Sequence, residues 1–315
     1  MKYREFSNVG WKVSEIGIGC WAIGSEWGDV SPENAKDALF TSLDNGVNFF
    51  DTADVYGDGR SEKFIGEILK NTKEKIYVAT KAGRRLDPHV SEGYNLNNIE
   101  AFIDRSLLNL GIDTIDLLQL HCPPSDICGK SETYEMMDEI VKKGKIKYYG
   151  VSVEKVSEAL DAIKFPNVRS IQIIFNIFRQ KPNEIFFKEA KKNNVAIIVR
   201  VPLASGLLTG KMNLNSSFPK NDHRNYNING DSFDVGETFS GINFHKGIEA
   251  VKELKTLLPQ DFSLTDLALK WILSHDEVTV VIPGAKNKLQ AQLNTRASEM
   301  NNIYTIMNSI SNIYE

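Results

Sequence analysis

Four polar residues lie at or just beyond the ends of apolar, strand-like segments. Asp51 and Tyr56 belong to FFDTADVYG at 49–57, Lys81 ends VATK at 78–81, and His121 ends LLQLH at 117–121. A phenol, an ammonium, a carboxylate and an imidazole can together protonate a carbonyl oxygen, with the phenol as the acid. The ammonium favours the ionised phenol and so lowers its pKa, the carboxylate holds the ammonium, and the imidazole can orient the carbonyl. In this order the four residues predict carbonyl chemistry, although none of them does so singly.

Apolar segments of strand length alternate with amphipathic helical patterns along the chain. Several strand-like segments, such as 171–175 and 195–199, are almost continuously apolar, which is typical of parallel strands buried on both faces. Among the helix ends, Asn97 with Glu100 predicts a capping box. The predicted strands are 14–19, 47–51, 76–81, 115–121, 146–152, 170–176, 195–201 and 278–282.

Eight strand–helix units in series predict an α/β protein with a closed (β/α)8 TIM barrel, formed by one domain over residues 1–315. Two doubly wound sheets are the alternative, but the sequence contains no linker that would separate two domains. Active sites of such barrels lie on the loops after the carboxyl ends of the strands. A barrel therefore explains why the four polar residues follow strands two, three and four. Residues 2–12 predict a hairpin that turns at 8–10 and could close the bottom of the barrel.

Composition and charge indicate a soluble globular protein, and the cysteines favour a cytoplasmic location. The apolar fraction is 42%, the charged fraction is 25%, and a net charge of −4 without a dominant basic block argues against nucleic acid as the main partner. No segment approaches the roughly 18 apolar residues of a membrane span, and the amino terminus lacks the apolar core of a signal peptide. The three cysteines, Cys20, Cys122 and Cys128, contain no Cys-x-x-Cys pair, which favours reduced thiols. Nothing in the sequence indicates an oligomeric state.

One interval between predicted strands is much longer than the others. It begins at 202–211 and continues through a polar stretch at 213–243, before helical patterns return at 245–257 and 264–274. Long loops of this kind are usually functional or disordered. We therefore expect either a part of the binding site or a mobile surface segment here.

Five motifs together resemble the aldo-keto reductases over nearly the whole chain. Within that family, the chain is similar to the bacterial branch related to general stress proteins and to potassium-channel β subunits. The resemblance implies an NADPH-dependent oxidoreductase that binds its cofactor in an extended form without a Rossmann sheet. The motifs are GIGCW at 17–21, DTADVYG at 51–57, Ser61-Glu62 followed by Gly66, GLLTGK at 206–211 and VIPGA at 281–285.

The resemblance also implies roles for individual residues. Tyr56 would be the general acid, Lys81 would lower its pKa and Asp51 would pair with Lys81. His121 would orient the substrate oxygen. A 2′-phosphate would suit Lys286 at the start of the last barrel helix. The implied cofactor contacts are Ser152, Gln172 and Asn176 at the carboxamide, Leu203, Ser205, Gly206, Leu207, Thr209 and Lys211 over the pyrophosphate, and Gly284, Lys286, Asn287, Gln290 and Asn294 at the adenosine end.

Two positions depart from the pattern of the family. Val153 stands where the family usually has Asn, so one carboxamide contact is lost or is supplied by neighbouring amides. Arg200 stands where the family has an aromatic residue that packs against the nicotinamide. A planar guanidinium can also stack there, or it can turn away and pair with an acid such as Asp222 or Glu237.

Other residues beside the predicted site have plainer explanations. Trp21 and Trp27 follow the first strand and Phe178 follows the sixth, so each is a candidate wall of the substrate pocket or a space filler. Cys122 next to His121 is interpreted as a small flanking residue rather than a nucleophile. No His-Glu-x-x-His or similar ligand spacing occurs, so no metal site is expected.

Three functions stay open at the level of sequence. The first is an NADPH-dependent reductase of aldehydes or ketones, which the complete set of four polar residues favours. The second is a sugar or polyol dehydrogenase that runs toward oxidation. The third is a weakly catalytic, cofactor-binding protein that senses redox state.

Overall fold

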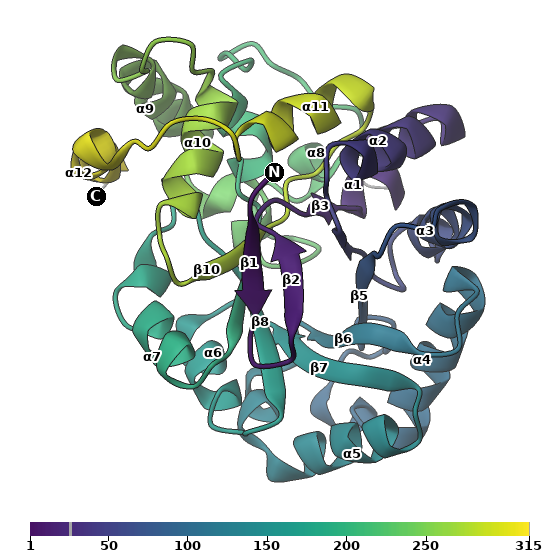
Figure 1. The fold of residues 1–315 in the computed structure, drawn as a ribbon. Helices are drawn as coiled ribbons and strands as arrows, with labels where there is room; N and C mark the ends of the chain where they lie inside the picture. Colours follow the sequence, from purple (N-terminus) through teal and green to yellow (C-terminus); the bar gives the residue numbers. More distant parts are fainter. Residues whose placement is uncertain (25–26, 315) are drawn as a thin grey trace.

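The computed structural model describes residues 1–24 and 27–314, which form a barrel of parallel strands surrounded by helices (Figure 1). Backbone bridges pair Ile16 with Val281 and Gly19 with Gly284, and they close the ring between its last and first strands. The predicted (β/α)8 barrel is thereby confirmed. The eight strands, hydrogen-bonded in chain order, are β3 (Ile18–Gly19), β4 (Phe49–Asp51), β5 (Tyr77–Ala82), β6 (Ile115–His121), β7 (Ile146–Ser152), β8 (Val168–Ile174), β9 (Ala196–Arg200) and β10 (Val278–Val281).

Helices cover the outside of this ring and fill the connections between strands. No helix in the described part of the chain is both long enough and apolar enough to cross a membrane. The helices are α1 (Trp21–Gly24), α2 (Pro32–Asp44), α3 (Arg60–Asn71), α4 (Leu96–Leu110), α5 (Ser131–Lys142), α6 (Val156–Ala162), α7 (Phe186–Lys192), α8 (His223–Tyr226), α9 (Phe244–Thr256), α10 (Leu264–Leu273), α11 (Lys288–Arg296) and α12 (Met307–Ser311). Short 3-10 turns lie at η1 (Ser91–Gly93), η2 (Ser125–Gly129), η3 (Lys181–Asn183), η4 (Ala204–Thr209), η5 (Val235–Glu237), η6 (Phe239–Gly241), η7 (Tyr304–Ile306) and η8 (Asn312–Tyr314).

The strands are buried on both faces, as their apolar sequences predict. All seven residues of β6 are buried, because side chains that point inward fill the barrel and those that point outward pack against helices. The predicted strands 115–121 and 146–152 coincide with β6 and β7. This burial holds the carboxyl ends of the strands rigidly at one end of the barrel.

Several predicted boundaries differ from those of the structure: the strand predicted at 170–176 is β8 (Val168–Ile174), and the strand predicted at 47–51 begins at Phe49. Two further differences have a clear cause. The first strand is much shorter than 14–19, because Ser14 belongs to the hairpin, where it pairs with Tyr3. The helix predicted from Asn97 begins two residues earlier. Asn95 is its N-cap, and the Asn95 side chain accepts a hydrogen bond from the backbone N–H of Asn98 at 3.1 Å.

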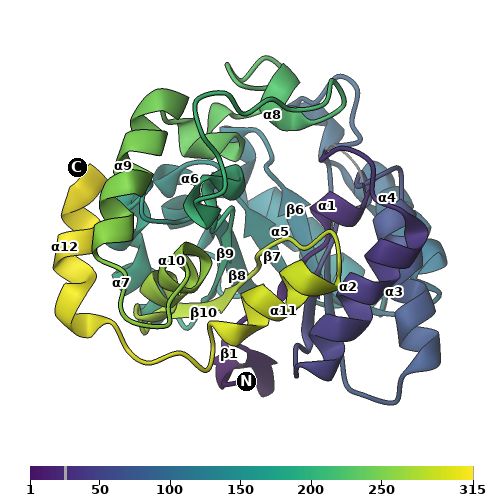
Figure 2. The ribbon, with the colours of Figure 1, turned by 90° about the horizontal axis from the view of Figure 1, so that it is seen from above.

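The predicted hairpin closes the end of the barrel opposite the polar residues. It consists of the antiparallel strands β1 (Tyr3–Phe6) and β2 (Trp11–Ser14). Phe6, Trp11 and Val13 belong to one apolar cluster with side chains from the barrel strands. Figure 2 shows β1 and α8 at opposite ends of the molecule. The site therefore has a floor made by the barrel core and an opening at the α8 end.

The long polar interval folds against the barrel mouth. Asp222, His223 and Asn227 in it are fully buried. Asp222 forms a backbone bridge with Trp27, from the loop after β3, and Asn176, just after β8, donates to Ser240 Oγ at 2.7 Å. The polar residues of this stretch are thus used for contacts with the barrel, and the predicted helices at 245–257 and 264–274 correspond to α9 and α10.

Candidate active site

The predicted catalytic residues converge on one ammonium group. Asp51 ends β4, Lys81 lies in β5, and Tyr56 lies in the turn after β4. Lys81 Nζ donates to Asp51 Oδ1 at 2.6 Å, to the carbonyl of Thr52 at 2.7 Å and to Tyr56 Oη at 3.4 Å. Both ions are almost completely buried. Neighbouring parallel strands thus bring together residues that are 30 positions apart in the chain.

Asp51 is held by more partners than the sequence predicts. Its second oxygen, Oδ2, accepts from Gln172 Nε2 at 2.7 Å and from Gln119 Nε2 at 3.1 Å. Because three side-chain donors share its two oxygens, the carboxylate has one orientation and fixes that of Lys81. Gln172 uses its amide nitrogen here, so its oxygen is the atom available to a ligand.

The imidazole of His121 lies across the phenol of Tyr56. The two ring centroids are 5.9 Å apart with perpendicular planes. Burial, followed by the charges of Arg84 and Lys81, holds the pKa of His121 well below its ordinary value. The imidazole is therefore neutral near neutral pH, and it can direct a substrate oxygen without adding a charge.

The acidity of Tyr56 differs from the sequence-based expectation. The pKa of Tyr56 lies well above its ordinary value, first because the phenol is buried and then because Asp51 and Glu237 lie near it, while Arg84 and Arg200 act in the opposite direction. The predicted lowering by Lys81 is not seen, because Asp51 already compensates the charge of the ammonium at 2.6 Å. The phenol consequently keeps its proton at neutral pH.

A cavity of about 980 Å³ opens above these residues, which is at the upper end of the range for small-molecule sites. It is lined by Asp51, Tyr56 and His121 and extends to the start of α11. Of the predicted cofactor and substrate contacts, it includes Trp21, Trp27, Ser152, Gln172, Arg200, Leu203, Ser205, Gly206, Thr209, Lys211, Gly284, Lys286, Gln290 and Asn294.

Four predicted contacts do not line this cavity. Asn176 donates to the carbonyl of Val201 at 2.9 Å and accepts from the N–H of Phe178 at 2.9 Å, so its amide organises the loop after β8. Phe178 and Leu207 are buried in the apolar core. Asn287 caps α11, with its side chain accepting from the N–H of Gln290 at 3.0 Å.

An aromatic wall, which the sequence predicts only in part, flanks the phenol. Trp21 stacks on Tyr56 with centroids 6.1 Å apart, and it meets Trp27 edge-on at 5.5 Å. His223 and Phe233 from the long interval pack against Trp21 at 4.7 and 5.8 Å. The wall depends on residues about 200 positions from Trp21, and no motif in the polar stretch marks them.

Cations gather at the end of the cavity remote from Tyr56. Lys286 donates to the carbonyl of Trp27, and Lys211 lines the same cavity. Arg224 of α8, which the sequence did not single out, stacks over Trp27 at 5.0 Å and donates to the carbonyl of Ser205 at 3.4 Å. Burial and then Arg224 hold the pKa of Lys286 below its ordinary value. Asp222 pairs with Arg224 through two bonds of 2.6 and 2.8 Å, so Lys211 and Lys286 are the cations of this group that suit phosphate groups.

The turn η4 brings backbone close to this cationic end. Ser205 and Gly206 adopt φ of 54° and 96°, the left-handed region in which glycine is favoured. A Cβ on Gly206 would lie 2.9 Å from the Met212 side chain. The bare backbone therefore allows a close approach of a ligand, and the residues present fit the phosphate chain of a dinucleotide.

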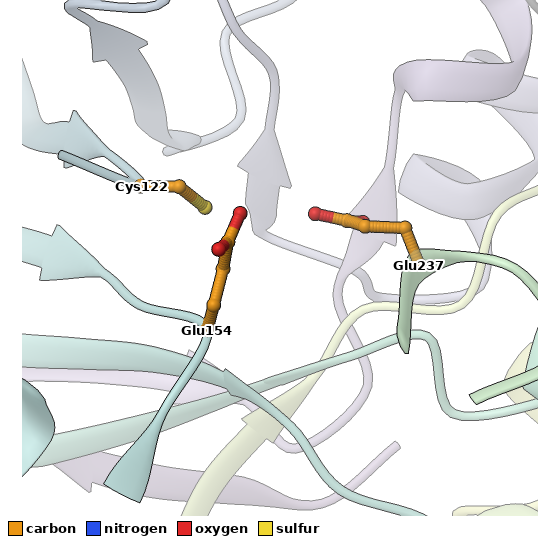
Figure 3. Close-up of side chains that lie close together, drawn as sticks. All are labelled: Cys122, Glu154 and Glu237. Carbon is orange, nitrogen blue, oxygen red and sulfur yellow. The ribbon is translucent and has the colours of Figure 1, made fainter. Parts of the chain in front are cut away.

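Three possible metal donors lie beside the catalytic residues. The side chains of Cys122, Glu154 and Glu237 point toward one another, with donor atoms within 4.8 Å (Figure 3). Arg84 pairs with both carboxylates, at 3.1 and 3.4 Å, and Arg200 pairs with Glu237 at 2.6 Å. Burial also raises the pKa of the Cys122 thiol. We therefore assign the carboxylates to an ion-pair cluster with the two arginines.

The chain belongs to the aldo/keto reductase family, whose model matches residues 15–313. It is 30% identical to the uncharacterized oxidoreductase YqkF of Bacillus subtilis, over 95% of this chain and 91% of that protein. It is 29% identical to a probable voltage-gated potassium channel subunit beta of Arabidopsis thaliana, over 95% of this chain and 92% of that protein. The NADH-specific methylglyoxal reductase of Escherichia coli is 26% identical, over 92% and 91%.

Solved structures give the same assignment. The aldo-keto reductase AKR11C1 from Bacillus halodurans, in its holo form, superposes with a TM-score of 0.78 at 28% identity, over 100% of this chain and 97% of that one. The glycerol dehydrogenase AKR11B4 from Gluconobacter oxydans superposes with a TM-score of 0.80 at 26% identity, over 99% and 94%. The fold and the oxidoreductase class predicted from the sequence are confirmed.

Proposed function

We propose that this protein is an NADPH-dependent oxidoreductase that reduces an aldehyde or a ketone to an alcohol. One observation carries the proposal: Lys81 Nζ lies 2.6 Å from Asp51 and 3.4 Å from Tyr56, and both of these residues line the cavity. The remote end of the same cavity carries Lys286 and Arg224. The proposal therefore combines a proton donor with a site for a phosphorylated cofactor.

Each catalytic residue has a definite task in this reaction. A bound nicotinamide would supply the hydride to the carbonyl carbon. Tyr56 donates its proton to the carbonyl oxygen, and Lys81 stabilises the phenolate that remains. His121, neutral and perpendicular to the phenol, orients the oxygen. The high pKa of Tyr56 keeps the proton in place until negative charge develops on the substrate.

The preference for NADPH over NADH is supported by charge. Lys286 and Arg224 line the same cavity. Arg224 is already paired with Asp222 at 2.6 Å, so Lys286 is the cation that a 2′-phosphate would meet. A relative at 26% identity is named NADH-specific, so cofactor preference varies within the family. The local cations of this chain are the reason for proposing NADPH.

Oxidation of a polyol is the second candidate, and one contact favours it. Arg200, at the end of β9, is paired with Glu237 at 2.6 Å, so its charge does not oppose an oxidised, positively charged nicotinamide. A structural neighbour is named a glycerol dehydrogenase. A redox-sensing role with little turnover, in line with the channel-subunit relative, is the third candidate. We further propose that the chain acts as one cytoplasmic domain, in line with its three unpaired, buried cysteines.

An assay of cofactor turnover distinguishes the three candidate functions. The purified protein is mixed with NADPH and a reactive aldehyde such as p-nitrobenzaldehyde, and the loss of NADPH absorbance is followed. NADP⁺ with glycerol and other polyols is assayed in parallel, and NADH and NAD⁺ are used in matched reactions. Faster aldehyde reduction than polyol oxidation supports the first candidate. Tight cofactor binding without turnover of any substrate would refute it in favour of the sensor.

A further inference from the structure

Arg200 carries a positive charge in the wall of the catalytic cavity. It ends β9 and lines the cavity together with Ser152 and Gln172. Only 7% of the residue is exposed. Its Nη2 donates to the carbonyl of Val153 at 3.0 Å, which fixes the plane of the guanidinium toward the end of β7. The charge therefore lies next to the residues that are expected to hold a nicotinamide.

Glu237 neutralises this charge from a different part of the fold. It lies in η5 of the long interval, and its Oε2 is 2.6 Å from Arg200 Nη1. Its backbone carbonyl accepts from Ser205 Oγ at 3.0 Å, so η4 fixes the backbone that carries the carboxylate. Burial acts to raise the pKa of Glu237, but Arg200 and Arg84 hold it below its ordinary value. Glu237 is thus ionised wherever the enzyme would work.

A second pair makes the whole cluster neutral. Arg84, in the loop after β5, pairs with Glu154 at 3.1 Å and with Glu237 at 3.4 Å. Two guanidinium groups therefore balance two carboxylates around the catalytic end of the cavity. Removal of either carboxylate would leave one uncompensated positive charge there, but only Glu237 contacts Arg200 directly.

The two redox states of a nicotinamide respond differently to such a charge. The oxidised ring is positive and the reduced ring is neutral, so an unpaired cation nearby repels only the oxidised form. We propose that Glu237 sets the ratio of the dissociation constants for NADP⁺ and NADPH by cancelling the charge of Arg200. This inference rests on the proposed binding of a nicotinamide cofactor. It makes Glu237 the residue that keeps both directions of the reaction accessible.

The experiment is a paired fluorescence titration of the full chain with NADP⁺ and NADPH at one salt concentration. In Glu237→Gln, the ratio of the dissociation constants, NADP⁺ over NADPH, should rise about tenfold or more, the scale of one unit charge at close range in a partly screened site. Glu154→Gln is the matched control, because it removes a carboxylate of the same cluster that does not contact Arg200; its ratio should change less. The double variant Arg200→Gln/Glu237→Gln should return the ratio toward that of the wild type.

The possible failures are distinguishable. If the wild type binds neither nucleotide, the proposed function is wrong, and this inference is wrong with it. If the wild type binds both but Glu237→Gln leaves their ratio unchanged, the inference alone is overturned. An equal loss of affinity for both nucleotides would likewise overturn it. Glu237 would then have only a structural role, which is to hold the long interval against the barrel.

Discussion

At the scale of residues, Lys81 connects the parts of the proposed reaction. Its ammonium contacts the carboxylate of Asp51, a backbone carbonyl and the phenol of Tyr56. Since the carboxylate compensates its charge, Lys81 does not make the phenol acidic in advance. It lies instead where the phenolate forms, and there it stabilises the product of proton transfer.

Replacement of Tyr56 by Phe removes the proposed proton donor. We expect kcat for aldehyde reduction to fall about 10²-fold or more, the scale of a lost general acid. The dissociation constant for NADPH should change little, because the hydroxyl is directed at Lys81 and the substrate. Steady-state kinetics and a cofactor titration measure the two effects. Turnover near that of the wild type would exclude Tyr56 as the acid.

Replacement of Lys286 by Ala tests the cofactor preference. We expect the affinity for NADPH to fall about tenfold, the scale of one charge-assisted contact, while the affinity for NADH falls less, because only NADPH carries the 2′-phosphate. Lys288→Ala, at an exposed lysine that begins α11 two positions further on and does not line the cavity, is the control. Equal losses for both cofactors in a fluorescence titration would show that Lys286 does not distinguish them.

At the scale of elements, two segments that are not part of the regular strand–helix repeat define the two ends of the barrel. The hairpin β1–β2 fills the bottom with apolar side chains. The interval between β9 and α9 covers the mouth, where Arg224 and Glu237 reach different parts of one cavity. The division agrees with the general rule that the bottom of a (β/α)8 barrel serves stability and the top serves function.

Replacement of Trp11 by Ala tests the role of the hairpin. The indole stacks on the ring of Tyr77 with centroids 4.5 Å apart, and its centroid lies 5.5 Å from that of the Phe6 ring. Its loss should lower the free energy of unfolding by about 3–5 kcal/mol. NADPH affinity should stay unchanged, because the cavity is at the other end. Leu108→Ala, at a residue that is 82% exposed, should change stability by less than about 0.5 kcal/mol. Urea unfolding measures the stability of both variants. A small effect of Trp11→Ala would mean that packing of the hairpin against the barrel contributes little to stability.

At the scale of the whole molecule, stability should depend on pH through a buried carboxyl group. Asp54 is fully buried, and neither of its side-chain oxygens has a hydrogen-bond partner in the described residues. Burial, and then the charge of Glu62, raise the pKa of Asp54 from 3.8 to about 7. The folded protein therefore binds this proton more tightly than the unfolded chain does. The contribution of Asp54 to the free energy of unfolding therefore falls as the pH rises from about 4 to about 7.

Replacement of Asp54 by Asn should remove this contribution. Relative to the wild type, the free energy of unfolding of Asp54→Asn should increase by roughly 4 kcal/mol between the acidic and the neutral end of that range. Urea unfolding of both proteins at about pH 5 and about pH 8 should detect most of this shift. Parallel pH profiles for the two proteins would show that Asp54 is ionised in the folded state and is stabilised by its surroundings.

The sequence alone predicted the barrel, which is confirmed, and the four polar residues that the structure brings together. Continuously apolar segments require burial on both faces, and parallel strands in a closed barrel place their carboxyl ends at one edge. For that reason Asp51, Lys81 and His121 could be assigned to one site from their positions after successive strands. The turn signal at 8–10 likewise predicted the hairpin before the first strand, which the structure places at the bottom of the barrel.

Only the tertiary structure decided which residues the long polar interval brings to the site. No periodicity or motif marks Arg224. For Glu237 the sequence offered only one of two possible acid partners of Arg200, and the structure selects Glu237 at 2.6 Å. The pKa of Tyr56 likewise depends on burial and on Glu237, neither of which can be seen in the motif around it. Asn176 and Phe178 do not line the cavity, because the Asn176 amide contacts Ser240 and the backbone N–H of Phe178, and the Phe178 ring is buried in the apolar core. Such features depend on how distant polar groups find partners in three dimensions, and local sequence patterns do not contain that information.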